Sequence, residues 1–213
     1  NFSIGDYFKR DAIVMAWDLM TQHFGLSADR IFATIYLDDE DAFRYWNEDI
    51  GIPEERIYRY GGKDNWWGPA GREGPCGPCS ELHYDSGSEY GCGPMAHPGE
   101  LTALQLQNID ATLPACHPNC NCERFVELWN LVFMQFFQDS DGNRTPLPAP
   151  SIDTGLGLER IAAVLQDKRS LYETDLFWPI IQAVCKLTSK TYGQNSETDY
   201  ALRVVAEHGR AAS

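Results

Sequence analysis

The chain has 213 residues, 43% of them hydrophobic, and its 31 acidic and 17 basic residues give a net charge of −14. This composition suffices for a hydrophobic core, and no apolar run approaches the roughly 18 residues of a membrane span. The acidic balance excludes a broad Lys/Arg face for phosphate binding within this segment, so a nucleic-acid partner would be bound mostly elsewhere.

The two ends of the chain indicate whether it is part of a longer protein. It starts at Asn1 instead of Met and stops at Ser213 within a helical pattern, so we expect both ends to be internal to a longer protein. The first residues lack a basic stretch followed by an apolar run, which argues against secretion.

The seven cysteines are an odd number. We therefore expect reduced thiols or metal ligands, in the cytosol or an organellar matrix.

The first fifty residues predict two helices around one strand. Residues 6–23 carry a broad apolar band that Gly25 ends, as in an amphipathic helix. The β-branched and aromatic residues 31–36, IFATIY, favour a strand, and the acidic residues 38–50 predict a second helix.

The middle of the chain is rich in glycine and proline. Residues 61–79 hold six Gly, three Pro and two Trp, a composition typical of an ordered functional loop. A short strand is predicted at 81–85, followed by a variable Cys-rich insertion at about 86–123. The largely apolar residues 124–137 predict either a strand buried on both faces or a buried helix.

The last third predicts an extended segment followed by helices. Alternate prolines keep residues 146–150 extended, and residues 151–166 pass through two glycines into a helix. Two further helices are expected near 175–187 and 198–213.

A compact polar cluster lies where the extended segment enters its helix. Asp153 ends the extended part, Gly155 and Gly157 allow a ligand to approach the backbone, and Glu159 and Arg160 occupy the first helical turn. The planar guanidinium of the arginine is suited to an acid or a phosphate. The pattern by itself is equally compatible with a structural turn.

Four segments together narrow the interpretation: residues 1–13, 64–85, 126–137 and 152–166. In this order they resemble the catalytic domain of the alanyl-tRNA synthetases, a family of class II aminoacyl-tRNA synthetases. The resemblance covers nearly the whole chain outside the Cys-rich insertion.

The resemblance implies an α+β fold, with a six- or seven-stranded antiparallel sheet flanked by helices and incomplete at its N-terminus. It implies activation of alanine by ATP and Mg²⁺ to alanyl-adenylate, followed by transfer to tRNA(Ala). Residues 1–195 would be part of the aminoacylation domain and residues 196–213 the start of a helical tRNA-recognition region. Motif one, the motif-two arginine and an editing module are expected outside the chain, so the isolated segment should be inactive.

Carried over residue by residue, the resemblance assigns Asp153 to the α-ammonium group of alanine and Gly155 to the pocket lining. Trp67, Asn130 and Val132 match positions that enclose the carboxylate and methyl groups, although core packing is the alternative for Trp67 and Val132.

The resemblance also implies an ATP site at the start of the last motif. Arg160 matches the arginine that contacts the γ-phosphate, and Gly157 and Glu159 lie beside it. A synthetase-like binding or regulatory protein that lacks aminoacylation remains an alternative of another class.

The cysteines allow two further interpretations. Residues 76–79, CGPC, match a thioredoxin-like redox turn, but the glycine-rich context lacks the strand before and the helix after it. Cys92, Cys116, Cys120 and Cys122, with His97 and His117 nearby, are candidate ligands for a structural Zn²⁺. Their spacing is also compatible with surface thiols.

The last helix carries the candidate tRNA contacts. It resembles the start of the tRNA-recognising region, which suggests Arg203, His208 and Arg210 as residues near the acceptor stem. A helix with one packed face would show a similar pattern. The sequence makes no prediction of oligomeric state.

Overall fold

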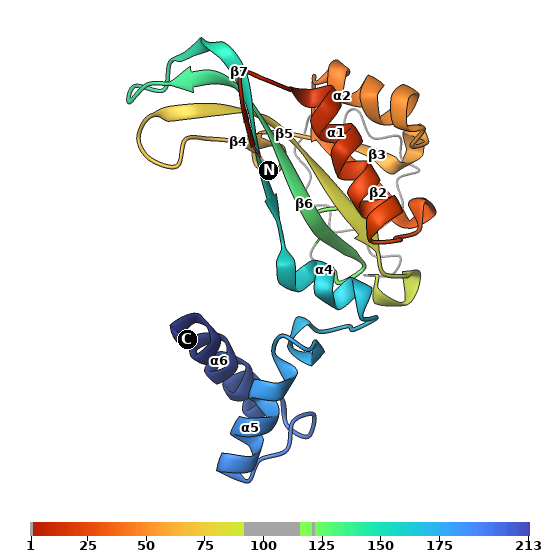
Figure 1. The fold of residues 1–213 in the computed structure, drawn as a ribbon, viewed down its shortest axis with the longest axis vertical. Coiled ribbons are helices and arrows are strands. Elements are labelled where there is room, and N and C mark those ends of the chain that lie inside the picture. The colour runs from red at the N-terminus through yellow and green to blue at the C-terminus, as the bar shows by residue number, and fades with distance from the viewer. Residues whose placement is uncertain (1, 92–115, 121) are drawn as a thin grey trace. The chain divides into compact units, whose positions relative to one another are not determined.

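The computed structural model describes residues 2–91, 116–120 and 122–213, and the chain divides into two compact units. The first unit comprises residues 1–157 and contains the sheet, and the second comprises residues 158–213 and is helical (Figure 1).

Seven strands form the sheet of the first unit, in the order β1-β7-β6-β5-β2-β3, with β4 paired to β5. Their bounds are β1 Phe2–Ile4, β2 Ile31–Tyr36, β3 Ile57–Tyr60, β4 Trp66–Trp67, β5 Gly74–Asp85, β6 Phe125–Gln138 and β7 Arg144–Leu156. The predicted antiparallel sheet is confirmed, with one exception: β2 and β3 run parallel. The reason is the helical crossover between these two strands, which returns the chain to the end of the sheet where β2 began.

Two helices cover one face of this sheet (Figure 1). Helix α1, Lys9–Asp18, continues into the π-helical turn η1, Leu19–His23, and α2, Glu40–Arg44, continues into η3, Tyr45–Ile50. The rings of Phe8 and Phe133 meet edge to face, with centroids 6.2 Å apart, and Trp46 Nε1 donates to Ser80 Oγ at 2.8 Å. Both predicted helices are therefore confirmed, and their buried faces pack on β5 and β6.

Strand β5 corrects the interpretation of residues 61–79 as a loop, because its regular structure begins at Gly74. Cys76 pairs with Phe136 and Cys79 with Val132, so Gly77 and Pro78 of β5 lie opposite residues 133–135 of β6, and the extra residue of this bulge is on β6. A bulge is one of the places where a sheet tolerates proline. The structure also settles the ambiguous segment at 124–137 as a strand, since β6 pairs with β5 on one side and β7 on the other.

The second unit contains helices α4, Leu158–Leu165, α5, Trp178–Thr188, and α6, Ser196–Ala212, with the short 3-10 turn η6, Leu171–Glu173. Its core includes Phe177, Ile181 and Ala206. The predicted helices are thus confirmed. Asn195 caps α6 by accepting a hydrogen bond from Thr198 N at 3.0 Å, so the boundary predicted between 195 and 196 coincides with a helix start. None of the described helices is long and apolar enough to cross a membrane.

Candidate active site

Three adjacent strands bring most of the predicted substrate residues onto one face of the sheet. Val132 lies opposite Asp153, and Asn130 lies opposite both Gly155 on β7 and Glu81 on β5. Side chains of directly opposed residues in antiparallel strands share a face. Phe133, the next residue along β6, points to the other face, where it meets helix α1. The candidate site is therefore on the face away from α1 and α2.

Asp153 and Gly155 leave room for a small ligand on this face. The Asp153 side chain is exposed, and its Oδ1 accepts a hydrogen bond from Thr154 N at 2.9 Å. A Cβ atom placed on Gly155 would meet no atom within 4 Å. Val132, which pairs directly with Asp153, is buried and supplies an apolar surface. A carboxylate, open space and an apolar wall together suit a small amino acid.

The two polar atoms of the Asn130 side chain have different surroundings. Its Nδ2 donates to Glu81 Oε1 at 3.2 Å, while its Oδ1 is buried without a hydrogen-bond partner among the described residues. A buried carbonyl oxygen that lacks a partner is costly, and a ligand N–H group can supply one.

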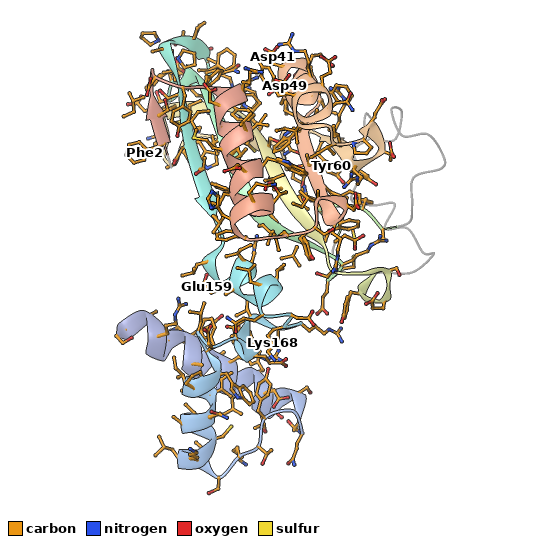
Figure 2. The ribbon with its side chains drawn as sticks, turned by 45° about the vertical axis from the view of Figure 1, so that its right-hand side comes forward. Phe2, Asp41, Asp49, Tyr60, Glu159 and Lys168 are labelled. Atoms are coloured by element: carbon orange, nitrogen blue, oxygen red, sulfur yellow. The ribbon has the colours of Figure 1, made fainter. Side chains whose placement is uncertain are left out.

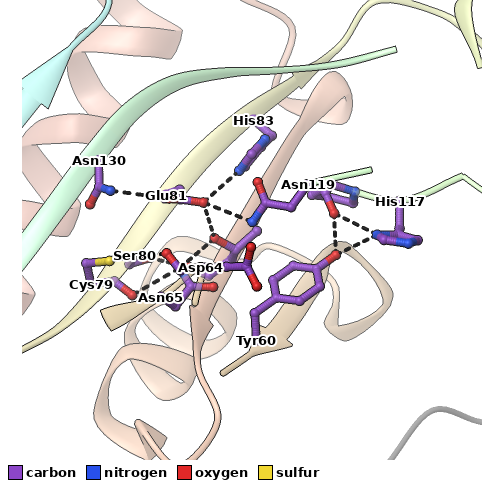
Figure 3. A network of polar contacts seen from close by, with 12 residues as sticks. Tyr60, Asp64, Asn65, Cys79, Ser80, Glu81, His83, His117, Asn119 and Asn130 are labelled. Atoms are coloured by element: carbon purple, nitrogen blue, oxygen red, sulfur yellow. Dashed lines mark hydrogen bonds and ion pairs between the residues drawn. The ribbon is translucent and has the colours of Figure 1, made fainter. Parts of the chain in front are cut away.

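Glu81 is the centre of the polar network that holds Asn130 (Figure 3). Its Oε2 accepts hydrogen bonds from Thr34 Oγ1 at 3.1 Å and Asn119 Nδ2 at 3.2 Å, and it lies 3.1 Å from His83 Nε2. The side chain is buried, and burial alone would raise its pKa. The hydrogen bonds from His83, Asn119 and Thr34 outweigh burial, so the pKa of Glu81 is lowered. The carboxylate is therefore charged and fixed.

Glu81 was not among the site residues predicted from the sequence. The available signal was a glutamate within a strand expected to be buried, because such a residue is seldom buried unless it is paired. A second polar residue, Asn65, extends the network by donating to Thr34 Oγ1 at 2.8 Å and to the carbonyl of Cys79 at 3.2 Å. The network thus ties the loop before β4 to the sheet.

Trp67 lies on β4, opposite Gly77 of β5. Its neighbour Trp66 packs among aromatic rings, with centroid separations of 5.2 Å to Tyr36 and 6.1 Å to Phe136. Strand β5 therefore lies between Trp67 and the candidate site. It pairs with β4 at Gly77 and, two residues further on, with Val132 of β6 at Cys79.

The redox alternative for residues 76–79 conflicts with the structure. Both cysteines lie within strand β5 and not at the start of a helix. Burial raises the pKa of Cys79 to about 12 and also raises the pKa of Cys76. Because the thiolate is the reactive form, these two thiols lack the property that a redox turn requires.

The predicted ATP residues fall in both units. Gly157 ends the first unit and donates its N–H to Leu128 O at 3.0 Å. Arg160 is exposed in the first turn of α4. Glu159, also in α4 (Figure 2), accepts a hydrogen bond of 2.5 Å from Arg210 Nη1, and this contact lowers the pKa of its carboxyl group.

The three candidate tRNA residues differ in their surroundings. Arg203 donates to Tyr192 OH at 2.8 Å and lies 5.2 Å from the ring centre of Tyr172. Arg210 pairs with Glu159 and lies 4.9 Å from the ring centre of Phe177. His208 is exposed. The two arginines therefore contribute to packing within the second unit, and a role for the three residues in tRNA binding stays a prediction.

Three of the predicted zinc ligands lie together, and two of the other candidates fall outside the described residues. The sulfur atoms of Cys116, Cys120 and Cys122 all lie within 4.8 Å of one another. Cys92 and His97 belong to the part that the structure does not describe. The His117 ring is used differently, because its Nδ1 lies 2.9 Å from Tyr60 OH and 2.7 Å from Pro118 O.

A cavity of about 500 Å³ offers a second candidate site, lined among others by Lys9, Asp39 and Trp66. Lys9 Nζ and Asp39 Oδ1 form a buried ion pair of 2.6 Å there. The lining contains none of the predicted substrate or ATP residues, and its one lysine is neutralised by the aspartate. The face that carries Asp153 and Asn130 is the better candidate for an active site.

Comparison with known proteins defines the class of protein to which this fold and site belong. The whole chain, residues 1–213, matches the family described as tRNA synthetases class II (A), and the chain belongs to this family. The curated proteins similar to this chain include several named alanine-tRNA ligase. The protein from Dehalococcoides mccartyi is 51% identical over 99% of the chain, that from Desulfosudis oleivorans 47% over 100%, and that from Natranaerobius thermophilus 45% over 100%. The chain spans 22% of the length of each of these relatives.

Proposed function

We propose that the protein is an alanine-tRNA ligase, which activates alanine with ATP to alanyl-adenylate and transfers the alanyl group to the 3′ end of tRNA(Ala). Membership of the class II family and about 50% identity to proteins of that name support the proposal. The structural observation that supports it is that Asp153 and Asn130, whose Oδ1 is unsatisfied, come from the same face of the sheet, where Val132 pairs with Asp153 and open Gly155 pairs with Asn130.

In this proposal the chain positions alanine by its two ends. Asp153 and Asn130 Oδ1 accept hydrogen bonds from the ammonium group, and Val132, Gly155 and Trp67 enclose the methyl group. The alanine carboxylate then attacks the α-phosphorus of ATP, and pyrophosphate leaves. Such a reaction depends on orientation and charge neutralisation and needs no covalent enzyme intermediate.

ATP enters as its magnesium complex, and we assign its γ-phosphate to Arg160. The guanidinium fork matches a phosphate group, and the residue is exposed in the first turn of α4. Gly157 and Glu159 precede it in sequence, and Glu159 accepts a hydrogen bond from Arg210. In this proposal Glu159 acts by holding α6 near the start of α4.

The remaining proposals concern the longer protein. Residues 1–195 form part of the aminoacylation domain, and residues 196–213 begin the tRNA-recognition region. The net charge of −14 makes this segment a poor phosphate-binding surface, so most tRNA contacts belong to other parts of the protein. The protein acts in the cytosol or in an organellar matrix.

The test is alanine-dependent ATP/pyrophosphate exchange by the full-length protein and its Asp153→Asn variant. Loss of a hydrogen bond to a charged group costs about 1.5 to 3 kcal/mol, so kcat/KM for alanine should fall roughly 10- to 150-fold. Asp141→Asn, an exposed residue of the β6–β7 turn, is the matched control and should exchange normally. The 213-residue segment alone should not catalyse exchange.

The same assay with glycine and serine tests the methyl-sized pocket. One methylene is worth about 1 to 3 kcal/mol, so glycine should react roughly 10- to 200-fold less efficiently than alanine, and serine should be poorly excluded. Absence of exchange with all three amino acids in the wild-type protein would favour the binding or regulatory alternative. Undiminished exchange by Asp153→Asn would contradict the assignment of the ammonium site.

A further inference from the structure

The turn before β6 gathers three cysteine sulfur atoms in a small volume. The Sγ atoms lie 3.8 Å apart for Cys116 and Cys120, 3.1 Å for Cys116 and Cys122, and 2.8 Å for Cys120 and Cys122. None of the three residues is in a disulfide. In a tetrahedral zinc site with Zn–S bonds of about 2.3 Å, neighbouring sulfurs are about 3.8 Å apart. The Cys116–Cys120 separation equals this value and the other two are shorter, so the three thiols lie close enough together to share one metal ion.

We propose that Cys116, Cys120 and Cys122 bind one Zn²⁺ through their thiolates, as three of its four ligands. Thiolate ligands select zinc over magnesium or calcium, and zinc accepts three protein ligands plus water. No other Cys, His, Asp or Glu within the described ranges joins this group.

The surroundings of the cluster suit a charged metal centre. Two of its cysteines are buried and pack with Phe125, while Phe32 and Cys122 pack against this group, so solvent is largely excluded. Three thiolates and Zn²⁺ leave one net negative charge. Arg124 lies against this charge, because its guanidinium donates to Cys116, and the same guanidinium is also paired with Asp85 at 2.8 and 2.7 Å. A buried charge needs such a partner.

The segment that carries two of these cysteines lacks regular structure, so a metal would stabilise it. Residues 116–120 form a turn closed by a bond of 3.1 Å from Cys120 N to His117 O. Asn119 within it has a positive φ of 65°, which asparagine tolerates better than most residues. A cation bound at both ends of the turn would hold these five residues in place without a hydrophobic core of their own.

The metal site is linked to the candidate substrate site through the same turn (Figure 3). Asn119, one residue before Cys120, donates to Glu81 Oε2, and Glu81 Oε1 accepts from Asn130 Nδ2. His117, one residue after Cys116, meets Tyr60 OH. Zinc binding would therefore help to orient Asn130, a consequence that rests on the proposed alanine site. The metal site itself does not depend on that function.

Metal content of the full-length protein tests the proposal directly. Wild-type protein and the variants Cys116→Ser and Cys120→Ser are purified under reducing conditions, and zinc is measured by elemental mass spectrometry. Each variant should contain one equivalent less than wild type. Cys185→Ser, in helix α5 of the other unit, is the matched control and should retain the wild-type content. Equal zinc content in all four proteins would overturn the proposal.

A second measurement on the wild-type protein covers the case in which the serine variants fail to fold. Replacement of zinc by Co²⁺ should give an intense sulfur-to-cobalt charge-transfer band, and a chelator should make three additional thiols reactive in the folded protein. Thiols that react fully without the chelator contradict the proposal, as does a disulfide between Cys120 and Cys122 in the reduced preparation. Both readouts are independent of alanine exchange, so failure of the metal site and failure of the proposed function are distinguishable.

Discussion

Among single residues, Glu81 carries the most interactions of the candidate site. It accepts three hydrogen bonds from side chains on other strands and loops, those of Thr34, Asn119 and Asn130, and it adjoins His83. Because the Asn130 amide nitrogen points to Glu81, the orientation of the Asn130 oxygen depends on this carboxylate. We class Glu81 as a positioning residue, since it acts on a substrate only through Asn130.

Glu81→Gln tests this role. The glutamine keeps the shape but removes the charge, so its NH₂ group faces other donors, and the loss should be about 1.5 to 3 kcal/mol. In exchange assays the KM for alanine should rise roughly 10-fold or more, with little change in the KM for ATP. Glu73→Gln, at an exposed position before β5, is the control. Equal effects on both substrates would indicate a general loss of structure.

The pH dependence of stability gives this variant a second readout. The folded-state pKa of Glu81 is lowered, because its hydrogen bonds outweigh burial. Its contribution is therefore fully present above the unfolded pKa of about 4.3 and is lost as the pH falls through the lower folded value. In urea denaturation of the 213-residue chain, the difference between wild type and Glu81→Gln should shrink below about pH 4.3. A constant difference down to pH 3 would contradict this cause.

At the scale of elements, the irregular pairing between β5 and β6 depends on Gly77. A Cβ atom there would lie 2.0 Å from the Phe133 carbonyl oxygen and 3.1 Å from Gln135 N, both backbone atoms of β6. These atoms move only if the two strands separate, so Gly77→Ala should cost about 3 kcal/mol, at the upper end of single substitutions. Gly71→Ala, where a Cβ meets nothing within 4 Å, should leave the urea midpoint nearly unchanged. Similar midpoints for the two variants would refute the close approach of β5 and β6.

Elements with a clear local pattern were predictable from the sequence, and elements stabilised by distant partners were not. IFATIY at 31–36 reads as a strand by composition and is β2. The run from Gly74 to Cys79 reads as a loop because glycine and proline disfavour strands, but pairing with β6 overrides this propensity. The segment at 124–137 could be resolved only by its two neighbouring strands.

The same distinction applies to the candidate site. Asp153, Asn130 and Val132 were found by resemblance, and the strand register places them on one face. The Glu81 network was not found, because its partners lie 47, 38 and 49 residues away in sequence. Contacts of that separation follow from the topology of the sheet and not from local periodicity.

For the molecule as a whole, the scarcity of basic residues constrains how the proposed tRNA partner would be bound. Arg203 and Arg210 already contact Tyr192 and Glu159, which leaves His208 as the exposed member of the predicted tRNA set. An acidic surface repels phosphates, so contacts from this segment must be few and local.

His208→Ala and Arg203→Ala separate recognition from packing in the full-length protein. His208→Ala should lower the rate of tRNA aminoacylation while leaving ATP/pyrophosphate exchange and stability unchanged. Arg203→Ala should lower stability by about 1 kcal/mol, because it removes a hydrogen bond to Tyr192. His23→Ala, an exposed histidine of the sheet unit, is the control. Normal aminoacylation by His208→Ala would remove this residue from the tRNA proposal.

The register between β1 and β7 has a consequence for synthesis in the cell. Phe2 pairs with Asp153, so the two strands are separated by about 150 residues of sequence. At translation rates of about 5 to 20 residues per second, β1 leaves the ribosome roughly 8 to 30 s before β7 does. On the nascent chain, β2 and β3 can pair long before β1 can pair with β7, although β1 precedes them in sequence. A chaperone that binds apolar segments would find Phe2 and Ile4 accessible throughout that interval, and they remain 73% and 83% exposed in the folded protein.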